Sequence, residues 1–343
     1  MRNSHDKTCS NETARARARG CIVQRECCST GEIQNHHRGR RQSTLYYLPL
    51  SLAERLGYFK DEGLDVDIVD FAGGAKALQA MMGGSADVVA GGYDHVIIMQ
   101  ARGQKLQAFV GMVATPSIAF GVAKARSASY RSPKDLKGWK IGVTAPGSST
   151  NIFLNHLLAS AGLSPDDVSI IGVGTGPTAV AAMRSGQIDA LANVEPAITI
   201  LERSSDMRVV VETMSEKGSR AVFGDLLPAG SLYTKQDFIK QNPNTAQALT
   251  NAMVRALKWL QKANPEDVAR VIPSEYLLGD KALYFAAFDR SREGYSKDGM
   301  ISPAGAAALY KILRSFDPAV KDGPQVDLAQ TNDNRFVERA LQR

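Results

Sequence analysis

Residues 64–94, LDVDIVDFAGGAKALQAMMGGSADVVAGGYD, carry the pattern that decides the fold. The apolar residues within 66–69 predict a short buried strand, and the Gly73-Gly74 pair opens a helix that runs to residue 82. A second apolar run at 88–90 predicts the next strand. Strand, helix and strand in about 30 residues are typical of a βαβ unit.

The same pattern recurs 102 residues later, in residues 166–196, DDVSIIGVGTGPTAVAAMRSGQIDALANVEP. Ten of the 31 aligned positions are identical without a gap. Gly176 now opens the helix, and 188–191 predict the second strand. The period is too long for a solenoid repeat. It indicates two similar α/β lobes that face each other.

Outward from this repeat, short strands alternate with helices along the chain. Strands are expected at 110–113, 121–123 and 140–143, and the last is followed by a helix to about residue 161. This order predicts a mainly parallel sheet in each lobe. We expect lobe one to comprise residues 43–120 plus 230–343 and lobe two residues 121–229, with a hinge near 120–123 and 227–231.

Length and charge agree with a two-lobed globular protein. The chain has 343 residues, more than a single core usually holds, with 44% hydrophobic and 22% charged residues. It contains no apolar run of the roughly 18 residues that span a bilayer. Most of the formal charge of +6 lies in residues 1–42, which hold nine Lys/Arg and four Asp/Glu. The body therefore has no basic surplus for a nucleic-acid partner.

Residues 1–42 differ from the rest of the chain. They contain all four cysteines and little periodic apolar sequence, so we expect a tail without fixed structure that is not a native start. The tail is basic but lacks the apolar stretch of a secretory signal. Its Cys and His residues lack the close pairing of zinc sites, and we expect no metal and no cofactor.

The duplicated unit predicts where a ligand binds. In open parallel sheets the crevice lies beyond the carboxyl ends of the strands, where helix N-termini offer unpaired N–H groups to an anion. The alternative for each such residue is that it only caps its helix. The candidate ligand contacts are Tyr46, Gly73, Gly74, Tyr93, Asp94, Thr115, Ser148, Ser149, Thr150, Gly176 and Glu195. Ser148-Ser149-Thr150 are expected to hold a negative group, with Tyr46, Tyr93 and Glu195 near the rest of the solute.

Several stretches resemble a known family. They are Leu56-Gly57-Tyr58-Phe59-Lys60-Asp61-Glu62-Gly63-Leu64, Gly83-Gly84-Ser85-Ala86-Asp87-Val88, Asp135-Leu136-Lys137-Gly138-Trp139-Lys140 and Gly186-Gln187-Ile188-Asp189-Ala190. Together they are similar to ABC-transporter periplasmic binding proteins of the nitrate/sulfonate/taurine type, which include binding proteins for thiamine-pyrimidine precursors (NMT1-like). The resemblance implies a type II periplasmic-binding-protein fold, two similar α/β lobes with a hinge, a periplasmic location and a membrane permease partner.

The sequence thus predicts a monomer that binds a small anionic organic solute, of the sulfonate, nitrate, carboxylate or pyrimidine class, and that is not an enzyme. One alternative is a pyrimidine-precursor synthase of the same fold, which would be expected to carry a cysteine-rich active segment. Residues 43–343 contain no cysteine, and His95 and His156 are isolated in the sequence. The other alternative is a ligand-sensing regulator, but residues 1–42 show no helical periodicity for a helix-turn-helix.

Overall fold

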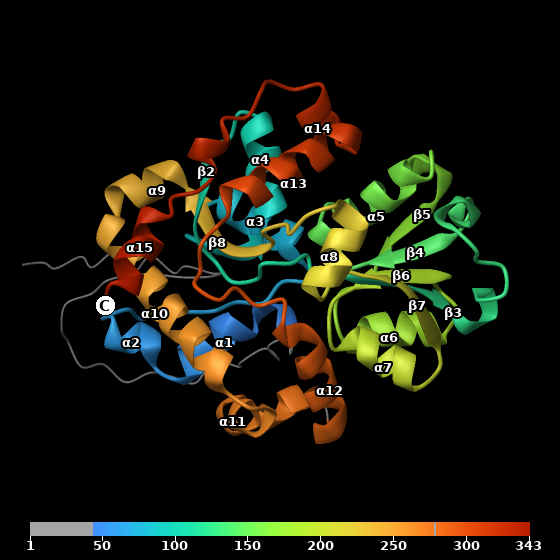
Figure 1. Cartoon of the computed structure of the whole chain (residues 1–343), viewed down its shortest axis with the longest axis horizontal. Helices are drawn as coiled ribbons and strands as arrows, with labels where there is room; N and C mark the ends of the chain where they lie inside the picture. Colours follow the sequence, from blue (N-terminus) through green and yellow to red (C-terminus); the bar gives the residue numbers. More distant parts are fainter. Residues whose placement is uncertain (1–43, 278) are drawn as a thin grey trace, which may run out of the picture.

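The computed structural model describes residues 44–277 and 279–343, which form two groups of strands, each with helices around it (Figure 1). The expectations for residues 1–42 lie outside the described residues. Mixed α/β architecture with two sheets agrees with the predicted two-lobed fold. The boundaries expected for the lobes remain a prediction.

The first sheet has three strands in the order β1-β8-β2. They are β1 (Val89–Gly92), β2 (Leu106–Gly111) and β8 (Gly230–Lys235), and β8 is antiparallel to both neighbours. Side chains alternate along these strands, so Leu232 packs into one apolar cluster while Tyr233 packs into another on the opposite face. Both faces of this sheet are therefore buried.

The second sheet has five strands in the order β5-β4-β6-β3-β7. Their bounds are β3 (Ala119–Ala123), β4 (Lys140–Val143), β5 (Ser169–Gly172), β6 (Ala190–Asn193) and β7 (Met207–Glu212). β4 runs parallel to β5 and β6, whereas β3 runs antiparallel to β6 and β7.

The expectation of mainly parallel sheets was therefore wrong in part. Each sheet contains one strand that the chain enters from the other sheet: β3 follows a crossing after β2, and β8 follows a crossing after β7. Because these strands arrive from the opposite direction, they run against their neighbours. Among the named strands of the described residues, parallel pairing is confined to β4 with β5 and β6.

The order of the first sheet repeats part of the second. β1, β8 and β2 occupy the places that β6, β3 and β7 occupy in the larger sheet. The strand expected at 66–69 is not formed in the described part of the chain. Its counterpart, β5, pairs only with β4, and the residues 102 positions before β4 are Arg38-Gly39-Arg40-Arg41. That run has no apolar side chain for a strand buried on both faces.

Fifteen α-helices lie in the described residues. They are α1 (Leu48–Arg55), α2 (Tyr58–Asp61), α3 (Gly74–Met82), α4 (Tyr93–Ala101), α5 (Ser149–Ser160), α6 (Pro177–Arg184), α7 (Ala197–Arg203), α8 (Glu216–Phe223), α9 (Gln236–Gln241), α10 (Pro243–Lys262), α11 (Pro265–Val271), α12 (Lys281–Arg292), α13 (Pro303–Phe316), α14 (Pro318–Lys321) and α15 (Arg335–Leu341). Short 3₁₀ helices cover Leu45–Tyr47, Lys124–Arg126, Pro133–Leu136, Pro165–Asp167, Ser274–Leu277 and Leu328–Gln330.

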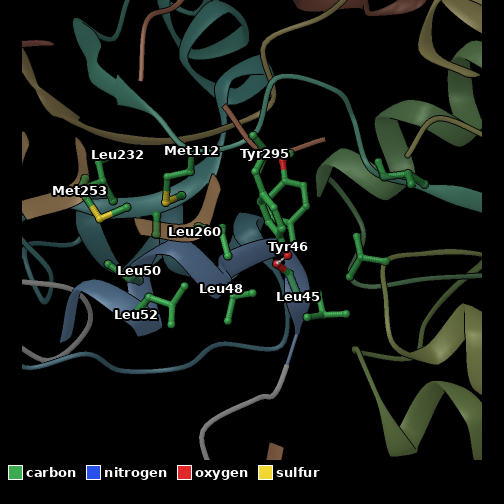
Figure 2. Close-up of a cluster of buried hydrophobic side chains, with 14 of the residues drawn as sticks. Leu45, Tyr46, Leu48, Leu50, Leu52, Met112, Leu232, Met253, Leu260 and Tyr295 are labelled. Atoms are coloured by element: carbon green, nitrogen blue, oxygen red, sulfur yellow. Dashed lines mark hydrogen bonds between the residues drawn. The ribbon is translucent and has the colours of Figure 1, made fainter. Parts of the chain in front are cut away.

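Helix α1 is held by a layer of large apolar side chains between it, α10 and the first sheet (Figure 2). Leu52 is fully buried there, and Leu45 and Leu48 continue the layer toward the second sheet. The Tyr295 hydroxyl donates a hydrogen bond of 2.8 Å to the Leu45 carbonyl oxygen. These contacts fix the start of α1, and with it the position of Tyr46.

Truncating Leu52 to alanine should lower the free energy of unfolding by about 2–5 kcal/mol, because the lost contacts leave a cavity between α1 and α10. Chemical denaturation of the full chain measures this change. The matched control is Leu341→Ala, whose side chain is exposed, and it should cost less than about 0.5 kcal/mol. Equal effects of the two substitutions would contradict the packing described here.

Candidate functional site

A cleft with about 990 Å³ of empty space, part of it open to solvent, lies where the N-termini of α3 and α5 face each other. Six of the predicted ligand contacts line it: Tyr46, Gly73, Gly74, Ser148, Ser149 and Thr150. They come from segments on either side of the cleft, before α1, before α3 and before α5. The cleft is therefore built from both halves of the repeat.

Ser148 precedes α5 but does not cap it. Its side chain makes no bond to the first turn of its own helix. Instead its Oγ accepts a hydrogen bond of 3.2 Å from the backbone N–H of Ala75 in α3, across the cleft. The proton of the Ser148 hydroxyl is thus not committed by this bond, and the α5 N-terminus keeps N–H groups that its N-cap does not satisfy.

Ser149 is committed to a carboxylate. Its hydroxyl donates a hydrogen bond of 3.0 Å to Asp94 Oδ1 at the start of α4. The same oxygen accepts from the backbone N–H of His95, and Asp94 is 8% exposed. A negative side chain therefore stands directly beside one of the three residues that the sequence assigned to an anion.

Thr150 is also committed, within its own lobe. Its Oγ1 accepts from the Thr144 backbone N–H at 3.0 Å and lies 2.9 Å from Thr144 Oγ1. Of the predicted serine-threonine triad, only Ser148 offers an uncommitted hydroxyl. Thr144 lines the cleft as well and was not among the predicted contacts.

The glycines before α3 allow the two sides of the cleft to come close. A Cβ on Gly73 would lie 2.8 Å from Ser148 Oγ, and one on Gly74 would lie 3.0 Å from His95 Cε1. His95 Nε2 lies 3.2 Å from the Gly147 carbonyl oxygen and its Nδ1 lies 3.1 Å from the Tyr233 hydroxyl. His95, which looks isolated in the sequence, therefore links two segments that meet at the cleft.

Tyr46 supplies a buried polar atom without a partner. The residue is 8% exposed, and its hydroxyl has no hydrogen-bond partner among the described residues. Burial raises the pKa of the Tyr46 phenol well above its usual value, with smaller contributions from Tyr47, Asp94 and Tyr233. The phenol is therefore a neutral donor near pH 7, and a bound solute could satisfy it.

The remaining lining is aromatic, apolar and acidic. Tyr47, Phe71 and Tyr276 add rings to the cleft, while Glu54 and Asp70 add carboxylates. No lysine or arginine belongs to the lining among the described residues. These positions were not predicted, because nothing in the local sequence around residue 70 or residue 276 indicates that they line the cleft.

Five predicted contacts lie outside the cleft lining: Tyr93, Asp94, Thr115, Gly176 and Glu195. The Tyr93 side chain points into the core of its lobe, where Asn332 Nδ2 donates a 3.2 Å hydrogen bond to its hydroxyl. Thr115 is fully buried, with Oγ1 3.0 Å from Ser117 Oγ. Gly176 is also outside the lining, and its neighbour Thr175 takes the place expected for it. The sequence placed the backbones of Tyr93 and Thr115 at strand ends, but tertiary packing turned their side chains away from the cleft.

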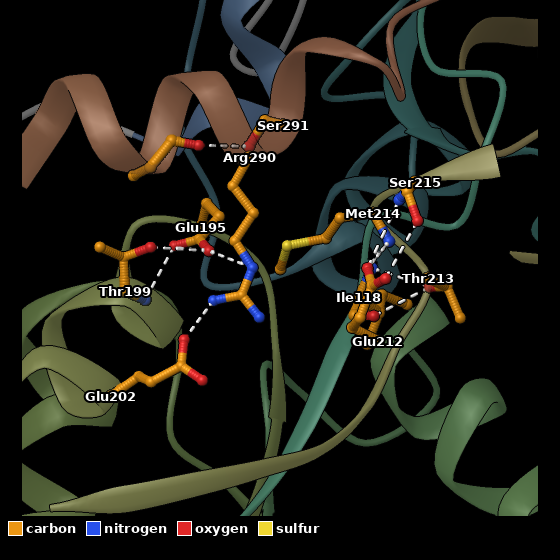
Figure 3. A network of polar contacts seen from close by, with 11 residues as sticks. Ile118, Glu195, Thr199, Glu202, Glu212, Thr213, Met214, Ser215, Arg290 and Ser291 are labelled. Carbon is orange, nitrogen blue, oxygen red and sulfur yellow. Dashed lines mark hydrogen bonds and ion pairs between the residues drawn. The ribbon is translucent and has the colours of Figure 1, made fainter. Parts of the chain in front are cut away.

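Glu195 is likewise absent from the cleft lining and is part of a separate polar network (Figure 3). Its carboxylate accepts hydrogen bonds of 2.9 Å from both the backbone N–H and the hydroxyl of Thr199. Arg290 Nε of α12 lies 3.6 Å from Glu195 Oε1, and the same guanidinium pairs with Glu202. Glu195 thus caps the start of α7, which was the structural alternative for a carboxylate at this position.

Burial raises the pKa of Glu195 to about 7, and the Thr199 hydrogen bonds and the Arg290 charge counteract part of that rise. The side chain is only 1% exposed. Because the carboxyl is more basic in the folded state than in the unfolded state, its contribution to stability is present at low pH and is lost as pH rises to about 7.

No helix in the described residues combines the length and the apolar character needed to cross a membrane. Within the same residues, no three or more His, Cys, Asp or Glu side chains gather in a way that could hold a metal ion.

Residues 44–268 match the family described as NMT1/THI5 like. The chain belongs to this family. Its fold is that of the periplasmic binding proteins, as the resemblance in the sequence implied. The match covers both sheets and ends after α10, so it includes every segment that lines the cleft except Tyr276.

Two of the following three relatives are named as solute-binding proteins. A solved protein from Bordetella bronchiseptica is 52% identical, with a TM-score of 0.85, over 88% of this chain and 95% of that one. The alkanesulfonate-binding protein SsuA of Xanthomonas axonopodis, bound to MOPS, is 20% identical, with a TM-score of 0.66, over 86% and 96%. The nitrate/nitrite binding protein NrtA of Nostoc is 29% identical over 43% of this chain and 32% of its own length.

An enzyme is also related. The 4-amino-5-hydroxymethyl-2-methylpyrimidine phosphate synthase of Schizosaccharomyces pombe is 28% identical over 45% of this chain and 43% of its own length. This related enzyme supports the alternative of a synthase, although the match covers less than half of either protein.

Replacing Glu195 with glutamine should make the protein relatively more stable at high pH. The difference in unfolding free energy from the wild type should grow by about 3 kcal/mol between pH 4.5 and pH 8, because the glutamine never pays the cost of a buried charge. Denaturation across this pH range measures it. Glu202→Gln, the more exposed partner of Arg290, should change by less than about 1 kcal/mol. A pH-independent difference for Glu195→Gln would contradict the raised pKa.

Proposed function

We propose that this protein captures a small organic solute in the cleft between its two lobes and delivers it to the permease of an ABC importer. The observation that carries the proposal is the pair of facing helix N-termini, α3 and α5, with the unpartnered Tyr46 hydroxyl between them. Lobe one would comprise residues 43–120 plus 230–343 and lobe two residues 121–229. Their closure would enclose the solute.

An anionic or hydrogen-bond-accepting group of the solute would bind at the α5 N-terminus. The uncommitted Ser148 hydroxyl and the first N–H groups of α5 are suited to such a group, because the helix dipole is positive there. Sulfonates, carboxylates, nitrate and pyrimidines with ring acceptors all meet this requirement.

The proposal includes a periplasmic location and a permease partner, and it is supported by relatives such as the periplasmic nitrate-binding protein NrtA of Synechocystis. The synthase remains the second candidate because of the related yeast enzyme. It is less favoured because the cleft lining holds no cysteine or histidine in the described residues, and so offers no nucleophile–base pair for covalent chemistry.

Native mass spectrometry of the full chain, purified from its source cells, should detect a co-purified small molecule at up to one per chain. The molecule should be released unchanged on denaturation. Recovery of a chemically altered product after incubation would favour the synthase instead, and no stabilising solute in any metabolite extract would contradict capture.

The substitution Ser148→Ala should weaken binding of that solute about tenfold or more, because a charge-assisted hydrogen bond is worth roughly 1.5–3 kcal/mol. Isothermal titration calorimetry measures the affinity. The matched control is Ser185→Ala, whose hydroxyl bonds the Ala182 carbonyl outside the cleft and should leave affinity unchanged. Unchanged affinity in Ser148→Ala with an intact fold would mean that the polar group of the solute lies elsewhere.

A further inference from the structure

A second chamber adjoins the cleft. It has about 430 Å³ of empty space, part of it open to solvent, and shares Tyr46, Ile118 and Ser149 with the cleft lining. The two spaces therefore lie next to each other at these residues. We call the second chamber the annex. It lies between α5, α8 and α13, and α13 packs against α5.

The annex is apolar over most of its wall. Ile152, Phe153, Phe223, Leu309, Ile312 and Phe316 provide most of the surface, with Pro228 and Ala229 beside them. Phe153 and Phe223 meet edge to face with ring centroids 6.1 Å apart. An aliphatic or aromatic group would gain by leaving water for this space, at about 25 cal/mol per Å² of apolar surface.

Besides Tyr46, the ionisable side chains that line the annex are those of His156 and Asp94. The His156 ring packs on Phe223 at 4.9 Å, and burial lowers its pKa, so the imidazole is neutral near pH 7. Asp94 is the other. It accepts hydrogen bonds from Ser149 and His95, but no lysine or arginine among the described residues forms an ion pair with it.

A carboxylate that is more than nine-tenths buried is costly without a cation nearby. The N-terminus of α4 supplies part of the compensation. Among the described residues, the walls of both spaces contain no lysine or arginine, so a cationic group of a solute is suited to supply the counter-charge. The unpartnered Tyr46 hydroxyl lies on the shared wall and can bond the same solute.

We propose that the solute carries a protonated amine or amidinium that pairs with Asp94, and an apolar group that occupies the annex. This inference rests on the proposed function and narrows its solute class. The solute is then an amphipathic, amine-bearing molecule, with an acidic group at Ser148 where it is a zwitterion. A bare inorganic anion such as nitrate uses neither Asp94 nor the annex.

Four probes separate these contributions: phenylalanine, 2-phenylethylamine, 3-phenylpropionate and glycine. The first carries an amine, a carboxylate and a phenyl group, and each of the others lacks one of them. Titration calorimetry on the full chain near neutral pH should show phenylalanine and 2-phenylethylamine binding about tenfold or more tightly than 3-phenylpropionate. Glycine should bind more weakly than phenylalanine by a similar factor, because it leaves the annex empty.

Two variants test the assigned residues. Asp94→Asn keeps an oxygen for Ser149 and His95 but removes the charge, so it should weaken the amine-bearing phenyl probes about tenfold and leave 3-phenylpropionate as tight or tighter. Ile312→Trp fills the annex and should weaken phenylalanine while leaving glycine within about twofold. Asp322→Asn and Leu341→Trp, both at exposed positions, are the matched controls.

Different results would overturn the assignment of Asp94 and the proposal of solute capture. If 3-phenylpropionate binds as tightly as phenylalanine, or if Asp94→Asn leaves amine binding unchanged in a folded protein, the assignment of Asp94 is overturned while solute capture stands. Binding of none of the four probes also overturns it. Solute capture itself fails only if native mass spectrometry and extract screening find no bound molecule at all.

Discussion

The contact between the start of α5 and the first turns of α3 and α4 determines what the cleft can hold. Three interactions make this contact: Ala75 with Ser148, Asp94 with Ser149, and His95 with the Gly147 carbonyl. Each joins residues 52–73 positions apart in the sequence. They bring the two sides so close that a Cβ on Gly73 would lie within 2.8 Å of Ser148 Oγ. This close approach leaves no room for a side chain at position 73 beside Ser148. A polar group bound there would meet backbone N–H groups and the Ser148 hydroxyl.

The same contact indicates that a negative group alone does not match the charges around this site. A helix N-terminus favours negative charge in isolation. Here Asp94 stands at one hydroxyl of that terminus, and the described walls of the cleft add Glu54 and Asp70 without a lysine or arginine. Local sequence around Ser148 could not reveal this, because Asp94 is brought there by tertiary packing. The electrostatics of a site depend on the residues that face each other across it, which only the fold determines.

Much of the architecture was nevertheless predictable. The 102-residue repeat predicted two similar lobes, and the structure places α3 and α6 at matching positions of that repeat. Periodicity also predicted α5 and its start at Ser148-Ser149. The strand at 66–69 was predicted from composition alone and was wrong, because a strand also needs a neighbour. In the second lobe β4 is that neighbour, whereas Arg38-Gly39-Arg40-Arg41 stands at the equivalent place in the sequence. Tyr93, Thr115 and Glu195 were predicted by backbone position, but side-chain direction depends on packing that no local pattern encodes.

The buried carboxylates connect the fold to the act of binding. Glu195 is buried beside Arg290, yet burial still raises its pKa to about 7, so its ion pair does not fully compensate for lost hydration. Asp94 has hydrogen bonds but no cationic partner in the described residues. Burial of both groups therefore makes the folded arrangement less favourable than its apolar contacts alone would. A solute that supplies charge to Asp94 removes one of these costs, and it does so only when the two sides meet. Differential affinity of this kind is what allows a ligand to shift a protein toward its closed state.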